Sequence, residues 1–220
     1  MGFIYKSCLL YTFLIFSFQS HQAQNADIQL LRKINVQRNT RLDASMQLIS
    51  NTEAYIGIGL PVSVVIASYI KHDKILFQQG VNMCLALGAS SVSTFILKRI
   101  VNRTRPGYTY PDIVAFENER SYSFPSGHTS NAFCTATSLS LHFKKWYVVI
   151  PSFLWAGTVG YSRMHLGVHY PSDVLAGAVT GAAGAWLSYK IQQQWLKRMQ
   201  KKKKIVNKGS SQRLFLSTTF

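Results

Sequence analysis

The chain has 220 residues, of which 47% are hydrophobic and 13% aromatic, and it carries a formal net charge of +16 with eight acidic side chains. This length fits a single domain, so we expect one functional site. So high a charge indicates an anionic partner, a membrane, or both. Nucleic acid is not the expected partner. The Lys and Arg residues interrupt long apolar runs, and their spacing matches no zinc finger, RNA-recognition domain or helix-turn-helix.

Residues 1–23 have the pattern of a secretory signal peptide. Lys6 precedes an apolar run at 8–18, and the small residues Ser20 and Ala23 follow it. The run is shorter than the roughly 20 residues that a spanning helix needs, which favours cleavage near Ala23. An uncleaved N-terminal anchor is the alternative. Residues 24–52 then have apolar positions at approximately helical spacing, which predicts an amphipathic segment lying on a surface.

Five apolar or weakly polar runs of near-spanning length follow, at residues 53–70, 75–97, 126–143, 146–162 and 171–191. They predict an all-α, integral-membrane helical bundle over residues 53–191, with about five spanning helices, or six if the N-terminal anchor is retained. Residues 192–220 are expected to form a basic cytoplasmic tail. A soluble all-α protein is the alternative, but several of the runs are joined by very short basic loops, which is typical of membrane proteins.

The loops predict an orientation. If each run spans once, the basic turns at 71–74 and 144–145 and the lysine-rich tail lie on one side, which the positive-inside rule makes cytoplasmic. Loops 98–125 and 162–170 then share the opposite face. We therefore expect a protein of the cytoplasmic (inner) membrane whose longer loops face the periplasm or the outside.

Three polar clusters lie at run ends on this shared face. The first consists of Lys98 and, after six residues, Arg105 and Pro106. A phosphate group requires dispersed positive charge, and arginine offers a planar fork for two of its oxygens. Taken alone, such cations are equally typical of residues that anchor a helix at the membrane interface.

The second cluster is the sequence from Phe124 to Thr129, which opens a predicted helix. Ser126 can cap this helix, and the small Gly127 lets backbone N–H groups approach an anion at the positive end of the helix dipole. His128 then lies beside that anion. By itself the pattern is also that of a helix cap next to an interfacial histidine.

The third cluster joins Ser162 and Arg163 to His169 and Asp173. Pro171 fits the first position of a helix, so Asp173 is the third, where a carboxylate can reach back toward His169. A carboxylate bonded to one ring nitrogen leaves the lone pair of the other free to attack phosphorus. Asp173 alone would be an ordinary favourable charge at a helix N-terminus. Three such clusters on one face favour function, because ionisable groups in membrane spans are costly.

Together the clusters resemble the three signature motifs of the type 2 phosphatidic acid phosphatase superfamily, in order and in spacing, over about residues 50–191. The resemblance implies that His169 attacks the phosphoryl group, that Asp173 orients it, and that His128 protonates the leaving oxygen and later activates water. The residues that it implies for holding the phosphate are Lys98, Arg105, Ser126, Gly127 and Arg163. No metal or other cofactor is expected, because these cations can neutralise the developing charge and the motifs lack a carboxylate cluster.

The predicted function is hydrolysis of a lipid phosphate monoester or pyrophosphate through a phosphohistidine intermediate. Candidate substrates are undecaprenyl pyrophosphate, phosphatidylglycerol phosphate, phosphatidic acid and lipid A phosphates. One alternative is an acid phosphatase or vanadate-dependent haloperoxidase acting on a soluble substrate, which the apolar runs disfavour. The other is a non-catalytic membrane protein that binds anionic lipid, which the complete set of motifs disfavours.

Overall fold

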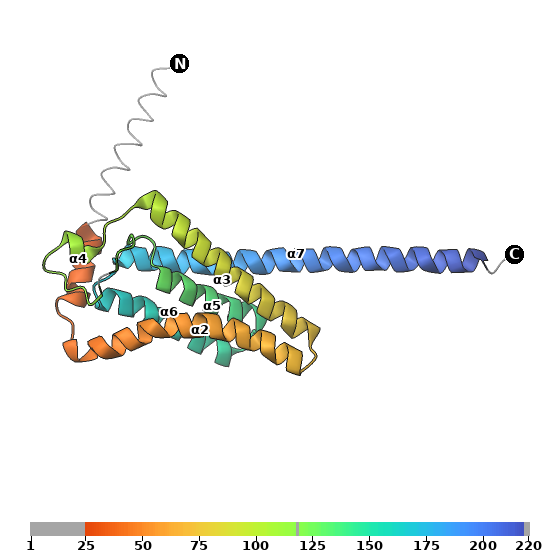
Figure 1. The fold of residues 1–220 in the computed structure, drawn as a ribbon, viewed down its shortest axis with the longest axis horizontal. Helices are drawn as coiled ribbons and strands as arrows, with labels where there is room; N and C mark the ends of the chain where they lie inside the picture. Colours follow the sequence, from red (N-terminus) through yellow and green to blue (C-terminus); the bar gives the residue numbers. More distant parts are fainter. Residues whose placement is uncertain (1–24, 118, 218–220) are drawn as a thin grey trace, which may run out of the picture.

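The computed structural model describes residues 25–117 and 119–217, with side chains described up to residue 201, and every regular element within these residues is helical (Figure 1). The predicted signal peptide or anchor at 1–23 lies outside the described residues. The elements are a helix over residues 25–35, η1 (Thr40–Leu42), α2 (Asp43–Ile70), α3 (Lys74–Val101), α4 (Pro106–Thr109), α5 (Gly127–His142), α6 (Trp146–His165) and α7 (Pro171–Ser217). The predicted all-α helical bundle is confirmed.

Each of the five predicted runs forms one long helix, and two of these helices extend beyond their runs. α2 begins at Asp43, so the second part of the segment predicted to lie on a surface continues into the bundle. α7 continues to Ser217 through the predicted tail (Figure 1). In the α2 extension the good helix formers are Ala, Met, Gln and Leu, and in the α7 extension they are Lys, Gln, Arg and Met, so both helices reach beyond their apolar runs.

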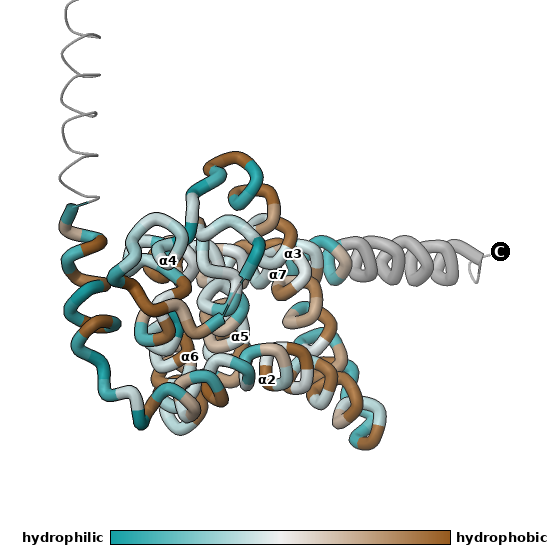
Figure 2. Tube along the Cα trace, turned by 60° about the vertical axis from the view of Figure 1, so that its left-hand side comes forward, coloured by the Kyte–Doolittle hydropathy of each residue, from teal (hydrophilic) through white to brown (hydrophobic). Residues whose placement is uncertain are grey.

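α2 and α3 contain the longest apolar stretches of the described bundle. Two helical segments of the described chain, Thr40–Ile70 and Lys74–Thr109, are long and apolar enough to cross a membrane. Large hydrophobic side chains such as Ile58, Leu85 and Phe95 are exposed on them, and Figure 2 shows apolar stretches along both helices. Exposed apolar surface of this extent is typical of a face that contacts lipid. The number of spans stays a prediction.

α5 is the central helix and carries little large apolar surface. It packs against α7 through glycines: a Cβ on Gly177 would lie 2.5 Å from the Ser126 carbonyl oxygen, and one on Gly181 would overlap the Ser130 carbonyl oxygen. Small residues allow two helix backbones to approach closely in this way. α5 and α7 therefore form a close-packed pair at the centre of the bundle.

The helix over residues 25–35 packs onto the loops at one end of the bundle. Ile28 and Leu31 are buried with Ile113 and Tyr170. The Asn35 amide donates to the Val114 and His165 carbonyl oxygens, at 3.1 and 2.8 Å. This part of the predicted surface segment thus covers the loops rather than lying free.

The ends of the helices fall into two groups. α3 and α6 end where α5 and α7 begin, and the longer loops gather there beside α4 (Figure 1). The α2–α3 and α5–α6 turns lie at the other end, where His142 contacts Asn82 at 3.1 Å. The three polar clusters therefore occupy the same end, opposite the basic turns.

Candidate active site

Arg105 follows α3 and immediately precedes α4, and its guanidinium is buried. Its Nε donates to the Ser121 carbonyl oxygen at 2.7 Å, and its Nη1 donates to the Val168 carbonyl oxygen at 2.9 Å. The same Nη1 lies 3.3 Å from Nε2 of His169. Two backbone carbonyls thus hold the cation against the imidazole.

His169 lies in the short loop between α6 and α7 and is almost fully buried. Its Nδ1 is 3.5 Å from Oδ2 of Asp173, while its Nε2 faces Arg105. Since a guanidinium can only donate, Nε2 is assigned as the acceptor and the ring proton is assigned to Nδ1. Burial lowers the pKa of His169 to about 3, so the imidazole is neutral at physiological pH.

Asp173 is the third residue of α7, as the position of Pro171 predicted. Its Oδ2 accepts from the backbone N–H of Tyr170 at 3.0 Å and from the Ser123 hydroxyl at 2.5 Å. Its Oδ1 accepts from Nη1 of Arg103 at 2.6 Å. Three donors on separate segments therefore fix the carboxylate that faces His169.

The start of α5 lies beside Asp173. The backbone N–H of Ser126 donates to the Asp173 carbonyl oxygen at 3.0 Å. The expectation that the Ser126 side chain caps the helix is wrong: its hydroxyl makes no capping bond and instead accepts from Thr129 at 2.9 Å. A Cβ on Gly127 would make only an ordinary 3.8 Å contact with Thr94, so protein packing alone does not require glycine there. His128 is half-buried at the second position of the helix.

Arg163 lies in the last turn of α6 with its side chain fully buried. It donates to the Ser50 hydroxyl at 2.6 Å, to Glu117 at 3.3 Å and to Glu119. Glu119 also accepts from Nη2 of Arg105, so one carboxylate bridges the two guanidinium groups.

The charge of Glu119 follows from these neighbours. Burial by itself raises the pKa of Glu119, but Arg163 and Arg105, with smaller effects of His169 and His128, outweigh it and lower the pKa to about 2. The carboxylate is therefore ionised, and it lies near both histidines of the predicted site.

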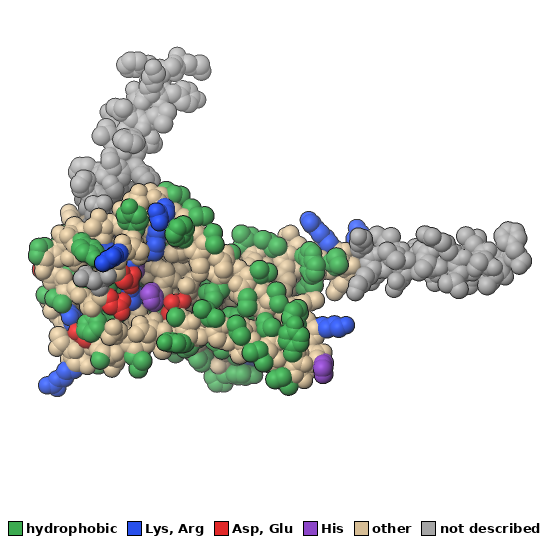
Figure 3. Space-filling view, viewed as in Figure 1, with side chains coloured by type: hydrophobic (Ala, Val, Ile, Leu, Met, Phe, Trp, Pro, Cys, Tyr) green, Lys and Arg blue, Asp and Glu red, His purple; other side chains and the backbone are tan. Residues whose placement is uncertain are grey.

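Lys98 completes the cluster from the last turn of α3. Its Nζ donates to the Tyr122 carbonyl oxygen, and it is close enough to interact electrostatically with Arg105 and Glu119. All eight predicted site residues thus lie at one end of the bundle. Figure 3 shows basic, acidic and histidine side chains gathered at this end, with hydrophobic side chains covering much of the remaining face.

Sequence reasoning missed several residues that hold this site together, namely Ser50, Arg103, Glu117, Glu119 and Ser123. It also missed Asp27, which pairs with Arg103 at 2.7 Å. The acidic ones carried a signal, because the chain has only eight acidic side chains and a buried arginine in a membrane protein needs a counter-charge. The serines carried none, since nothing in their local sequence predicts contact with Arg163 or Asp173. His165 ends α6 and bonds to Asp43 at 2.8 Å, so it joins two helices.

Comparison with known proteins identifies relatives across most of the chain. Lipid A 4'-phosphatase of Bacteroides thetaiotaomicron is 34% identical over 147 residues, which cover 61% of this chain and 65%, just under two thirds, of that protein. Undecaprenyl-diphosphatase of Sulfolobus acidocaldarius is 28% identical over 86% of this chain and 91% of its own length. Phosphatidylglycerophosphatase B of Bacillus subtilis is 29% identical over 81% of this chain and 90% of its own length.

Two solved structures share the fold. The crystal structure of Aquifex aeolicus LpxE has a TM-score of 0.64 and 31% identity, covering 75% of this chain and 95% of that one. The transmembrane PAP2 type phosphatidylglycerolphosphate phosphatase of Bacillus subtilis has a TM-score of 0.69 and 26% identity, covering 85% and 95%. The family model of the PAP2 superfamily matches residues 79–197, just over half of the chain. Family model, relatives and solved structures agree with the three motifs, and the chain belongs to the PAP2 superfamily.

Proposed function

We propose that this membrane protein is a lipid phosphatase in which His169 takes the phosphoryl group from a lipid phosphate monoester or pyrophosphate. The relatives are named as phosphatases of lipid A, undecaprenyl diphosphate and phosphatidylglycerophosphate, which supports the predicted class. The observation that carries the proposal is the buried, neutral imidazole whose Nε2 lies 3.3 Å from Arg105, beside a carboxylate bridging two arginines.

The bridging carboxylate indicates where phosphate binds. Arg105 and Arg163 both donate to Glu119, and the oxygens of a phosphoryl group offer the same forked acceptor to guanidinium groups. A phosphate that replaces Glu119 there lies next to Nε2 of His169. The amides at the start of α5, including that of Gly127, and the ammonium group of Lys98 supply further donors.

Two displacement steps at phosphorus follow from this arrangement. First, the Nε2 lone pair attacks phosphorus and the bond from phosphorus to the lipid oxygen breaks. His128, which takes up a proton when the anionic phosphate binds beside it, gives that oxygen the proton. The Nδ1 proton stays directed at Asp173, which stabilises the charged phosphohistidine. Next, His128 accepts a proton from water as the water oxygen attacks phosphorus. The phosphorus–nitrogen bond breaks, and orthophosphate leaves.

Replacing the two histidines separately tests these roles. His169→Ala should abolish turnover and the phosphoenzyme, because the nucleophile has no substitute. His128→Ala should lose on the order of 10² or more in turnover but still form phosphoenzyme slowly from an activated substrate such as p-nitrophenyl phosphate. Both are measured by phosphate release and by trapping labelled protein, in EDTA, since the scheme requires no metal. His72→Ala, at the opposite end of the bundle, is the matched control, and full activity of His169→Ala would refute the mechanism.

We further propose that the site faces the outside of the cytoplasmic membrane. The basic turns at 71–74 and 144–145 support this orientation, because they lie at the opposite end of the bundle and the positive-inside rule places them in the cytoplasm. Single cysteines at the exposed positions Arg120 and His72, in a background without the three native cysteines, can be labelled in intact cells with an impermeant thiol reagent. Labelling at position 120 but not at 72 is expected, and the reverse pattern would place the site in the cytoplasm.

A further inference from the structure

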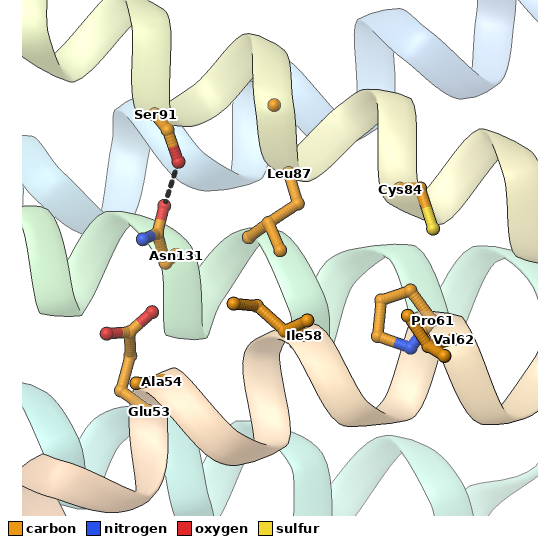
Figure 4. Close-up of a pocket in the computed structure, with 10 residues that line it drawn as sticks. Glu53, Ala54, Ile58, Pro61, Val62, Cys84, Leu87, Ser91 and Asn131 are labelled. Atoms are coloured by element: carbon orange, nitrogen blue, oxygen red, sulfur yellow. Dashed lines mark hydrogen bonds between the residues drawn. The ribbon is translucent and has the colours of Figure 1, made fainter.

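A cavity of about 430 Å³ lies between α2, α3 and α5, and its two ends differ in chemistry (Figure 4). Ile58, Pro61 and Leu87 belong to its apolar part. At the other end Glu53, Ser91 and Asn131 face one another from the three helices. The cavity is thus a mainly apolar space with one polar end.

Glu53 differs from every other acidic side chain of the chain. Of the eight acidic residues, Asp73 caps α3, and six others form ion pairs with arginine, namely Asp27, Asp43, Asp112, Glu117, Glu119 and Asp173. Glu53 is 8% exposed and forms neither an ion pair nor a helix cap with the described residues. A buried carboxylate without a directly paired cation is costly, and a hydrogen-bond donor that enters the cavity would offset part of this cost.

The polar neighbours of Glu53 are oriented. Ser91 donates to Oδ1 of Asn131 at 3.1 Å, which leaves the amide nitrogen of Asn131 turned toward the Glu53 carboxylate (Figure 4). A carboxylate accepts about four hydrogen bonds, and a single amide cannot supply them. Glu53 therefore offers unused acceptor sites to whatever enters the cavity.

Helix geometry places this polar end beside the phosphate site. Glu53 is three residues along α2 from Ser50, which accepts from Arg163, and Asn131 is three residues along α5 from His128. Residues three apart lie on the same side of a helix, roughly 5 Å apart along its axis. A group bound by Glu53 and Asn131 would therefore lie about one helical turn from the phosphoryl group.

We propose that Glu53, positioned by Asn131, selects lipids that carry a hydrogen-bond donor, a hydroxyl or an amide N–H, within a few bonds of the phosphate ester. The hydrocarbon chain of such a lipid then lies against the apolar part of the cavity. This inference rests on the proposed phosphatase function. Acylated amino sugars and glycerol phosphates both carry such donors, whereas a polyprenyl pyrophosphate carries none, and a buried acceptor disfavours a ligand that leaves it unpaired.

The test compares substrates within one protein preparation, in detergent, by the initial rate of phosphate release. The four substrates are a phosphorylated acyl-glucosamine lipid, phosphatidylglycerol phosphate, undecaprenyl pyrophosphate and p-nitrophenyl phosphate. Glu53→Ala should lower kcat/KM about tenfold to 100-fold for the two lipids that carry donors, because a hydrogen bond to a charged acceptor is lost. Rates with the other two substrates should stay near those of the wild type.

Because only ratios between substrates are compared, the folded fraction of each preparation cancels. Glu53→Gln keeps the shape of the side chain and one acceptor oxygen, so it should show the same selectivity change to a smaller extent. Val62→Ala removes an apolar group from the same cavity and should leave the preference for donors unchanged. A loss confined to the amino-sugar lipid, or to the glycerol lipid, identifies which donor Glu53 binds.

An equal fall of all four rates in Glu53→Gln, or no fall with either donor-bearing lipid, would overturn this inference. Failure of the phosphatase function looks different. In that case the wild type would release no phosphate from any of the four substrates, or it would release phosphate at a rate that His169→Ala does not change.

Discussion

The α5–α7 pair and the α2–α3 pair meet in different ways. α5 and α7 touch through their backbones, since a Cβ on Gly177 or Gly181 would meet main-chain atoms of the other helix. Near their turn α2 and α3 also touch, since a Cβ on Gly80 would lie 2.9 Å from the Val65 backbone nitrogen. Farther along α3, a Cβ on Gly88 would have no neighbour within 4 Å, and the two helices flank the cavity that Glu53 lines. Beside the site, therefore, the α5–α7 pair is closed and the α2–α3 pair is open.

This difference matches the groups that each pair carries. α5 and α7 carry His128 and Asp173, whose separation must stay fixed within a fraction of an ångström for proton transfer and for orientation of His169. α2 and α3 carry exposed apolar side chains and the mainly apolar cavity. We infer that the closed pair positions the reacting groups, while the open pair admits lipids of different shapes.

The largest effect is expected where the closed pair is forced apart. In Gly181→Ala the new methyl group would overlap the Ser130 carbonyl oxygen and approach the Cys134 backbone nitrogen at 2.9 Å, so the helices must separate. Overpacking of this kind costs about 1–3 kcal/mol or more. We expect most of the folded protein to be lost, measured as the monodisperse fraction in detergent, with activity falling in parallel.

Gly88→Ala in α3 is the matched control, because it makes the same chemical change in a helix with open space around the added methyl. It should leave folding intact or stabilise the helix by about 0.5–1 kcal/mol. If Gly181→Ala instead behaved like Gly88→Ala, α5 and α7 would not be the rigid pair that the comparison requires.

The same contrast explains how much could be predicted from the sequence. The five long helices were predictable because each apolar run is bounded by basic or polar turns and loops. The positions of Lys98, His128 and Asp173 at run ends followed from those runs. Which arginine Glu119 and Ser50 contact was not predictable, because both bond to Arg163, which is far from them in sequence, and no local pattern encodes such pairing. The cavity at Glu53 was equally hidden, since it results from how three helices diverge.

A smaller effect is expected at Glu119, which connects the loop after α3 to α6 through its two arginines. Glu119→Gln removes the carboxylate that bonds to Arg105 and Arg163 where phosphate is proposed to bind. Orthophosphate and vanadate should then inhibit roughly twofold to tenfold more strongly, because no internal anion competes with them. Asp112→Asn removes an exposed carboxylate of the same loop that pairs with Arg32, and it should leave the inhibition constants unchanged. Weaker vanadate inhibition in Glu119→Gln would mean that Glu119 helps to bind the anion.

The smallest effect is expected on the pH dependence of stability, which Glu119→Gln should alter. The pKa of Glu119 is about 2 in the folded protein, against an ordinary value of 4.5, so its contribution to stability is fully present above pH 4.5 and is lost as the pH falls toward 2. The pKa of His169 is about 3, against an ordinary value of 6.5, so below pH 6.5 the unfolded chain binds a proton that the folded protein does not, and stability falls.

The measurement is the melting temperature in one non-ionic detergent, followed by tryptophan fluorescence. From pH 6.5 to 4.5 it should decline in parallel for wild type and Glu119→Gln, with the variant lower. Below pH 4.5 the two curves should converge and meet near pH 2, because the unfolded chain takes up the Glu119 proton first and at pH 2 the folded protein takes it up as well, which makes Glu119 as neutral as glutamine. Curves that remain parallel below pH 4.5 would show that the Glu119 carboxylate does not stabilise the fold through Arg105 and Arg163.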